Sequence, residues 1–278
     1  MFIVVVYALA IALSLLVGLT GGYESAFTGV GFVTMFLPTI AVILVQSMAQ
    51  GTLQIGWRRF AVSFLPVALL LIPVTLHAGM FAVMWDAGPL PWAAWLTPAA
   101  DGLYHSPDSQ GWGVLTAQGL MARIVLNAVI GIAVVSALAL FEEIGWRGWL
   151  LPRFMRRMSA RRAVVATAIV WALWHVPFGL SGIQHIEGVS PMRVAILVPF
   201  GTVAAGLVIG WLWVRTESIW IAAIAHGALN NWGQYAFKFM DDFTVPDQTV
   251  VLAAGFVALY GVGTVLLAFG ISSARTMT

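Results

Sequence analysis

The chain contains about eight stretches of mostly apolar residues, each long enough to cross a lipid bilayer as a helix. They lie near residues 1–20, 30–50, 60–84, 123–151, 163–182, 192–214, 217–233 and 248–270. The chain is 61% hydrophobic and only 9% charged, and its mean hydropathy is +0.95. A soluble core of 278 residues could not bury so much apolar surface. We therefore predict an all-α membrane protein, a bundle of about eight transmembrane helices forming a single polytopic domain over residues 1–278.

The first apolar stretch, MFIVVVYALAIALSLLVGLTGG, lacks a preceding basic region and an A-x-A cleavage site. We predict a retained transmembrane helix rather than a removed signal peptide. The net charge of +2 is too mild to indicate nucleic acid as a partner. There are no cysteines, which excludes disulfides, thiolate metal sites and cysteine nucleophiles.

The basic residues predict the orientation of the bundle. With the N-terminus in the cytoplasm, nine arginines fall on that side: Arg58, Arg59, Arg153, Arg156, Arg157, Arg161, Arg162, Arg215 and Arg275. The other side receives three basic residues: Arg123, Arg193 and Lys238. Since cytoplasmic loops carry the excess of Lys and Arg, we predict a multi-pass plasma-membrane protein with both termini cytoplasmic. The arginines from 153 to 162 are also expected to contact anionic membrane lipids.

A few polar side chains fall inside the apolar stretches, where ionisable groups are rare and usually face a cavity or each other. They are Glu142, Glu143, Arg147, His175, His226, Asn230 and Asn231. At 1.5 Å per residue, Glu142 and His226 lie roughly 14 Å, and His175 roughly 18 Å, from the cytoplasmic ends of their helices. Three separate helices thus bring polar groups to similar depths, which favours one shared site.

The helical positions of the charged residues assign them different tasks. Glu142 and Glu143 are adjacent, so they point about 100° apart around the helix. Glu143 and Arg147 are four residues apart with the acid first, the favoured geometry for an ion pair within a helix. Such a pair reduces the cost of burying either charge. Glu142 is left without a local partner and becomes the candidate general base, aimed at His175 and His226.

Two further pairs share a helical face because they are also four residues apart: His226 with Asn230, and Trp171 with His175. The alternative is that these polar groups only hold helices together by hydrogen bonds. Architectural features are expected as well: Pro177 should kink or end the fifth helix, and the glycines of GLVIG, Gly206 and Gly210, should allow close helix packing.

Three motifs together resemble the CPBP intramembrane proteases, also called Abi or CAAX-protease-like proteins. EEIGWR (Glu142 to Arg147) resembles the EExxxR signature, WALWH (Trp171 to His175) resembles FxxxH, and HGALN (His226 to Asn230) resembles HxxxN/D. The resembling core runs from about 120 to 235. The chain departs from the family pattern at Trp171, where phenylalanine is typical.

The resemblance implies a membrane hydrolase whose polar cavity opens to the cytoplasm. It implies that Glu142 and His175 activate water and that His226 and Asn230 stabilise the oxyanion, while Glu143 and Arg147 orient the site. Family members are described both as metalloproteases and as glutamate-dependent enzymes. A site of Glu142, His175 and His226 could hold Zn²⁺ or another divalent metal. We favour water activation by Glu142 and His175 without a metal.

The expected function is hydrolysis of a peptide bond in a membrane-associated or lipidated peptide or protein. A proton-coupled transporter is the first alternative, because Glu and His at mid-depth also suit ion relays. The second is a non-enzymatic immunity or scaffold protein that uses the same polar cluster for binding.

Overall fold

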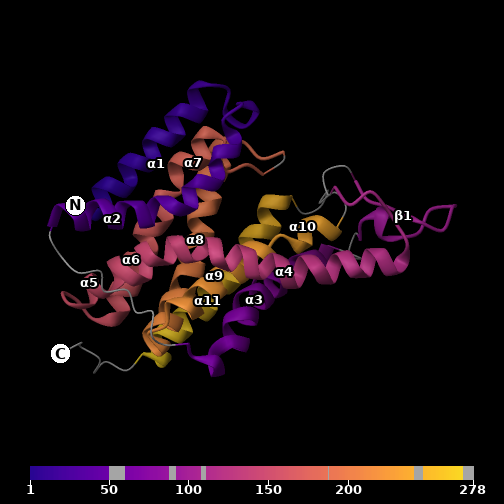
Figure 1. Cartoon of the computed structure of the whole chain (residues 1–278). Helices are drawn as coiled ribbons and strands as arrows, with labels where there is room; N and C mark the ends of the chain where they lie inside the picture. The colour runs from indigo at the N-terminus through magenta and orange to yellow at the C-terminus, as the bar shows by residue number, and fades with distance from the viewer. Residues whose placement is uncertain (50–59, 88–91, 108–110, 187, 241–246, 272–278) are drawn as a thin grey trace.

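The computed structural model describes residues 1–49, 60–87, 92–107, 111–186, 188–240 and 247–271, and it is built mostly of helices (Figure 1). The longer helices are α1 (Phe2–Leu19), α2 (Leu37–Ala49), α3 (Leu65–Ala87), α4 (Ala117–Glu143), α6 (Ala160–Trp174), α8 (Pro191–Thr216), α9 (Ile219–Trp232) and α11 (Gln248–Gly270). Short elements connect them: the 3-10 turns η1 (Gly22–Glu24), η2 (Thr28–Phe36), η3 (Val62–Phe64) and η4 (Ala94–Leu96), the helices α5 (Leu151–Met155), α7 (Val176–Ser181) and α10 (Tyr235–Phe239), and the two-stranded hairpin β1 (Tyr104–His105) and β2 (Val114–Leu115).

Seven segments of the described chain are long and apolar enough to cross a membrane. They are Phe2–Leu19, Gly29–Ser47, Val62–Trp85, Ala117–Met155, Ala160–Ser181, Pro191–Thr216 and Gln248–Gly270. The eighth predicted stretch, 217–233, forms α9, which has 14 residues and is shorter than those segments. It packs against α3, α4 and α8 inside the bundle, so its apolar residues are covered by protein. The predicted all-α membrane bundle is confirmed.

Glycines set the closest helix contacts, as small residues do within membranes. A Cβ added at Gly206 would lie 2.7 Å from the Cβ of Ala168, and one at Gly210 would lie 2.5 Å from Val164. The predicted close packing of GLVIG is therefore confirmed between α8 and α6. At Gly227 an added Cβ would lie 2.2 Å from Ser136 Oγ, so α9 approaches α4 equally closely.

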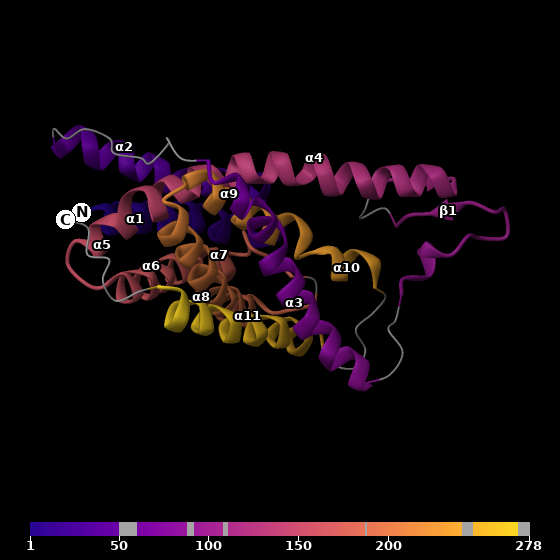
Figure 2. The same cartoon turned by 90° about the horizontal axis from the view of Figure 1, so that it is seen from below.

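The bundle has two ends, at which the transmembrane helices begin or finish. Figures 1 and 2 show these two ends at opposite sides of the molecule. The arginine-rich end carries six described arginines: Arg153, Arg156, Arg157, Arg161, Arg162 and Arg215. α1 begins there, since Met1 and Phe2 line one pocket with Arg153, Arg156 and Arg157. α11 finishes there, since Arg161 Nη2 donates to the carbonyl of Ala268 (2.7 Å) and Arg215 Nη1 to that of Gly270 (3.3 Å).

The opposite, arginine-poor end carries Arg123, Arg193 and Lys238 among the described residues, together with the β1–β2 hairpin and α10. The first residue of α1 and the last residue of α11 thus lie at the same end, the one richer in arginine, as the charge pattern predicts. Which side of the membrane that end faces stays a prediction. Arg58, Arg59 and Arg275, which contributed to it, lie outside the described residues.

Candidate active site

The buried carboxylate of Glu143 joins two helices. Arg147 Nη1 donates to Glu143 Oε1 at 2.8 Å, and both side chains are fully buried, so the predicted ion pair is confirmed. His226 Nδ1 contacts the same oxygen at 2.9 Å. Glu143 therefore holds His226 of α9 against the end of α4. This second contact differs from the sequence-based expectation, which directed His226 towards Glu142.

Glu142 lies beside this group but is held by neutral donors. Its Oε2 accepts the indole N–H of Trp171 at 2.9 Å and that of Trp146 at 3.4 Å. Among the residues the structure describes, no cation forms an ion pair with it and no hydrogen bond engages its Oε1. Oε1 is thus free to accept a hydrogen bond from water. Trp146 follows Glu142 by four residues. The four-residue spacing that predicted the Glu143–Arg147 pair could therefore have predicted this contact as well. The contact from Trp171, on another helix, leaves no such signal.

His175 sits where the fifth transmembrane segment breaks. α6 ends at Trp174 and α7 begins at Val176, because Pro177 has no N–H for the carbonyl four residues earlier. The predicted effect of Pro177 is confirmed. His175 Nδ1 lies 3.0 Å from the carbonyl oxygen of Trp171, which can only accept, so Nδ1 carries the proton. Nε2 of the neutral ring is then left as a proton acceptor.

Trp171 contacts Arg147 and both histidines of the site as well as Glu142. The guanidinium of Arg147 lies 4.4 Å from the centre of its ring, and the rings of His226 and His175 pack edge-on at 4.9 and 5.8 Å. The phenylalanine typical of the family motif could provide the ring contacts, but it has no N–H to donate to Glu142. The departure seen in the sequence therefore adds a hydrogen bond at the candidate base.

The candidate catalytic residues Glu142, His175, His226 and Asn230 line one cavity of about 620 Å³. Trp171 and Trp174 form part of the wall, whereas Glu143 and Arg147 are absent from the lining and lie behind it. Asn230 is exposed, while Glu142 is only 4% exposed. The structure thus assembles the predicted residues in one place.

Asn231, the remaining polar residue of α9, has an architectural position. Its Nδ2 donates to the carbonyl of Asn127 at 3.3 Å, and Tyr235 Oη donates to the Asn127 side chain at 3.1 Å. The first bond fastens α9 to α4 and the second fastens α10 to α4, both outside the cavity. The hydrogen-bonding interpretation considered for all the polar residues therefore suits this asparagine.

The cavity lies towards the arginine-poor end. Among its other lining residues are those of η2 (31–35), of the connection after α7 (183–186) and of the two positions after α9 (233–234). The resemblance implied a cavity open to the cytoplasm, and the charge pattern predicted a cytoplasmic arginine-rich end. A cavity that lies towards the arginine-poor end cannot open to the cytoplasm if the arginine-rich end is cytoplasmic. The two predictions therefore cannot both be right.

The predicted metal ligands have suitable donor atoms but do not converge. Among the described residues, no three His, Asp or Glu side chains are grouped closely enough to hold a metal ion. Glu142, His175 and His226 do not form such a group as arranged here, and a metal at this site stays a prediction. The mechanism below is derived from the side chains alone.

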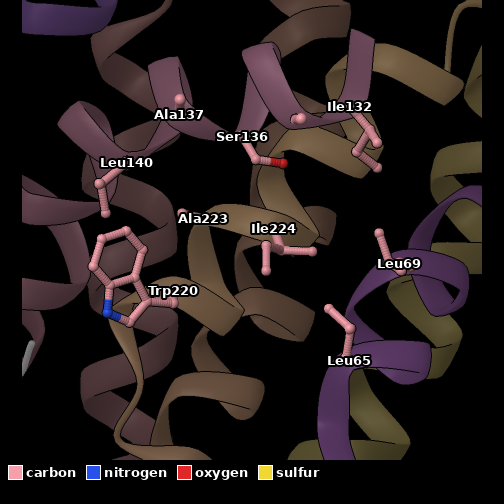
Figure 3. A pocket seen from close by; sticks show the side chains of 10 residues that line it. Leu65, Leu69, Ile132, Ser136, Ala137, Leu140, Trp220, Ala223 and Ile224 are labelled. Carbon is pink, nitrogen blue, oxygen red and sulfur yellow. The ribbon is translucent and has the colours of Figure 1, made fainter. Parts of the chain in front are cut away.

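A second cavity, of about 350 Å³, opens between α3, α4 and α9 (Figure 3). Figure 3 shows Leu65, Leu69, Ile132 and Ile224 around it, with the Ser136 hydroxyl among apolar groups. None of the predicted catalytic residues lines it. It offers an apolar surface and no acid or base.

Comparisons with known proteins support the resemblance over the part of the chain that carries the motifs. Residues 124–232 match the family model described as type II CAAX prenyl endopeptidase Rce1-like. The chain is also similar to CAAX prenyl protease 2 of Methanococcus maripaludis, with 27% identity over 125 residues. The match covers 44% of this chain and 46% of that protein, so the chain spans about half the length of the curated relative it matches. The predicted resemblance to CPBP-family proteases is thereby confirmed for this part of the chain.

The buried ion pair generates a stability prediction. We expect Arg147→Met to lower the free energy of unfolding by about 3–5 kcal/mol, because it leaves Glu143 without its buried cation. Chemical or thermal unfolding in detergent measures the effect. The exposed Arg123→Met is the control and should be near neutral. The double variant Glu143→Gln/Arg147→Met should be more stable than Arg147→Met alone, and a double variant that is less stable would contradict the pairing.

Proposed function

We propose that this chain is an intramembrane endopeptidase that hydrolyses a peptide bond in a membrane-associated or lipidated peptide or protein. The observation that carries the proposal is the single cavity lined by Glu142, His175, His226 and Asn230, with the Glu143–Arg147 pair behind its wall. The similarity to a CAAX prenyl protease supports the reaction class and a lipidated substrate. A transporter or scaffold has no comparable support.

Glu142 and His175 activate the water. Glu142 Oε1 has no hydrogen-bond partner in the described chain, and Nε2 of neutral His175 is an acceptor, so both can hold a water in the cavity. As the water oxygen bonds to the carbonyl carbon, one of its protons passes to this pair. The pair then gives that proton to the amide nitrogen as the C–N bond breaks, which releases an amine and a carboxylic acid.

His226 and Asn230 stabilise the oxyanion. The Asn230 side chain supplies an N–H from the exposed side of the cavity. His226 donates through Nδ1 to Glu143, so it offers a second N–H at Nε2 only when it is protonated. Each such donor is worth roughly 2.7–4 kcal/mol to the transition state.

The assignment of Glu142 as base predicts that Glu142→Gln lowers kcat by about 10²–10⁴-fold. The glutamine oxygen can still accept from Trp171 and Trp146, so the fold should persist. The measurement is cleavage of a fluorogenic peptide library by purified protein in detergent or bilayers. The exposed Glu24→Gln is the matched control. Full activity in Glu142→Gln would refute this assignment, and loss of proton or solute flux instead of cleavage would favour a transporter.

The metal-free mechanism makes its own prediction. A strong chelator should leave peptidase activity unchanged, and purified protein should contain less than one zinc per chain. Activity and zinc content are measured on the same sample before and after chelation. Stoichiometric zinc, with activity lost to the chelator and restored by Zn²⁺, would overturn the metal-free mechanism and make Glu142, His175 and His226 the candidate ligands.

Trp171 is predicted to position Glu142 through its N–H. We expect Trp171→Phe to lower kcat roughly tenfold to hundredfold with KM little changed, because a hydrogen bond to a charged group contributes about 1.5–3 kcal/mol. The ring that packs on Arg147 and both histidines is retained. Trp85→Phe, at a side chain 77% exposed, is the control. An unchanged kcat with a raised KM would show that Trp171 serves only as cavity wall.

A further inference from the structure

The cavity of the candidate active site is confined to one half of the bundle. α8 and α11 both begin at the arginine-poor end, where Arg193 and Asp247 approach to 4.0 Å. Of these two helices, the lining residues lie in the first half: Val194, Val198, Gly201 and Thr202 of α8, and Leu252 and Phe256 of α11. The cavity therefore extends from mid-depth towards the arginine-poor end.

The opposite direction is blocked by packed side chains. α4 continues into η6 (Ile144–Leu150), a wide π-helical segment in which all seven residues are buried. The ring of Trp146 packs edge-on against Phe2 at 5.8 Å and Trp174 at 5.5 Å, and Leu151 beyond it is completely buried. The cavity that Glu142 lines and the pocket that Arg153 of α5 lines have no lining residue in common.

The lining also limits what can enter. Of the cavity residues that the structure describes, Glu142 is the only acid, and none is Lys or Arg. The lining also includes Gln184 and the exposed Gln234 and His185, and the ring of His185 stacks on Tyr23 at 3.9 Å. Such a surface suits an uncharged segment of peptide.

We infer that the substrate reaches Glu142 from the arginine-poor end and that this end faces away from the cytoplasm. The second part follows from the excess of arginine at the other end, since positively charged ends stay in the cytoplasm. The inference deepens the proposed function and rests on it for the substrate: a peptide presented at the non-cytoplasmic surface of the membrane. The route into the cavity stands on geometry and charge alone.

The absence of cysteine from the sequence allows a direct test by single-cysteine labelling. Gln234→Cys and Phe32→Cys report on the cavity mouth, and the exposed Ser159→Cys and Arg156→Cys report on the arginine-rich end. Intact cells producing the full chain are treated with a membrane-impermeant charged maleimide. We expect the mouth positions to be labelled, and the other two to be labelled only after the cells are permeabilised.

The reverse pattern would overturn the inference, and so would labelling of all four positions, or of none, in intact cells. Because labelling needs no catalysis, it is repeated in the Glu142→Gln background with the same expected result. An impermeant fluorogenic peptide added to intact cells should be cleaved by the unaltered chain, with cleavage lost in Glu142→Gln. The expected labelling without any peptidase activity would refute the proposed function while the access route stands.

Discussion

The site depends on the shared carboxylate oxygen of Glu143. A charge this deeply buried is costly unless it is paired and hydrogen-bonded, and here Arg147 from the same helix and His226 from α9 meet at one atom. The contact is therefore more than an ion pair within one helix, because it also sets the distance between α9 and the end of α4. Gly227 next to His226 allows that approach by leaving room for Ser136. Electrostatics and close packing act at the same point of the bundle.

Glu142 is free for chemistry because its neighbour takes the local cation. Arg147 is within reach of both glutamates in sequence, but its hydrogen bond goes to Glu143, and Glu142 receives only the neutral N–H groups of Trp171 and Trp146. These neutral donors orient the carboxylate of Glu142. Because they form no salt bridge with it, the carboxylate can still accept a proton. One glutamate thus orders the helices and the adjacent one faces the cavity.

The sequence could predict what depends on local periodicity. Apolar runs located the transmembrane helices, and a spacing of four residues paired Glu143 with Arg147. Pro177 marked the break beside His175. The contacts that sequence reasoning missed, from Trp171 to Glu142 and from His226 to Glu143, join residues 29 and 83 positions apart. They depend on how α6 and α9 rotate against α4, which hydropathy does not encode because side chains all around a membrane helix can be apolar.

The sequence could not predict in which direction the cavity opens, for a related reason. Depth estimates count residues from a helix end, and they place Glu142, His175 and His226 at similar levels without saying which way the space between them opens. That direction depends on which side chains fill the bundle above and below. Trp146, Trp174 and Leu151 fill it on one side, while the break at His175 shortens α6 on the other. A proline and two tryptophans therefore decide from which end a substrate can approach the glutamate.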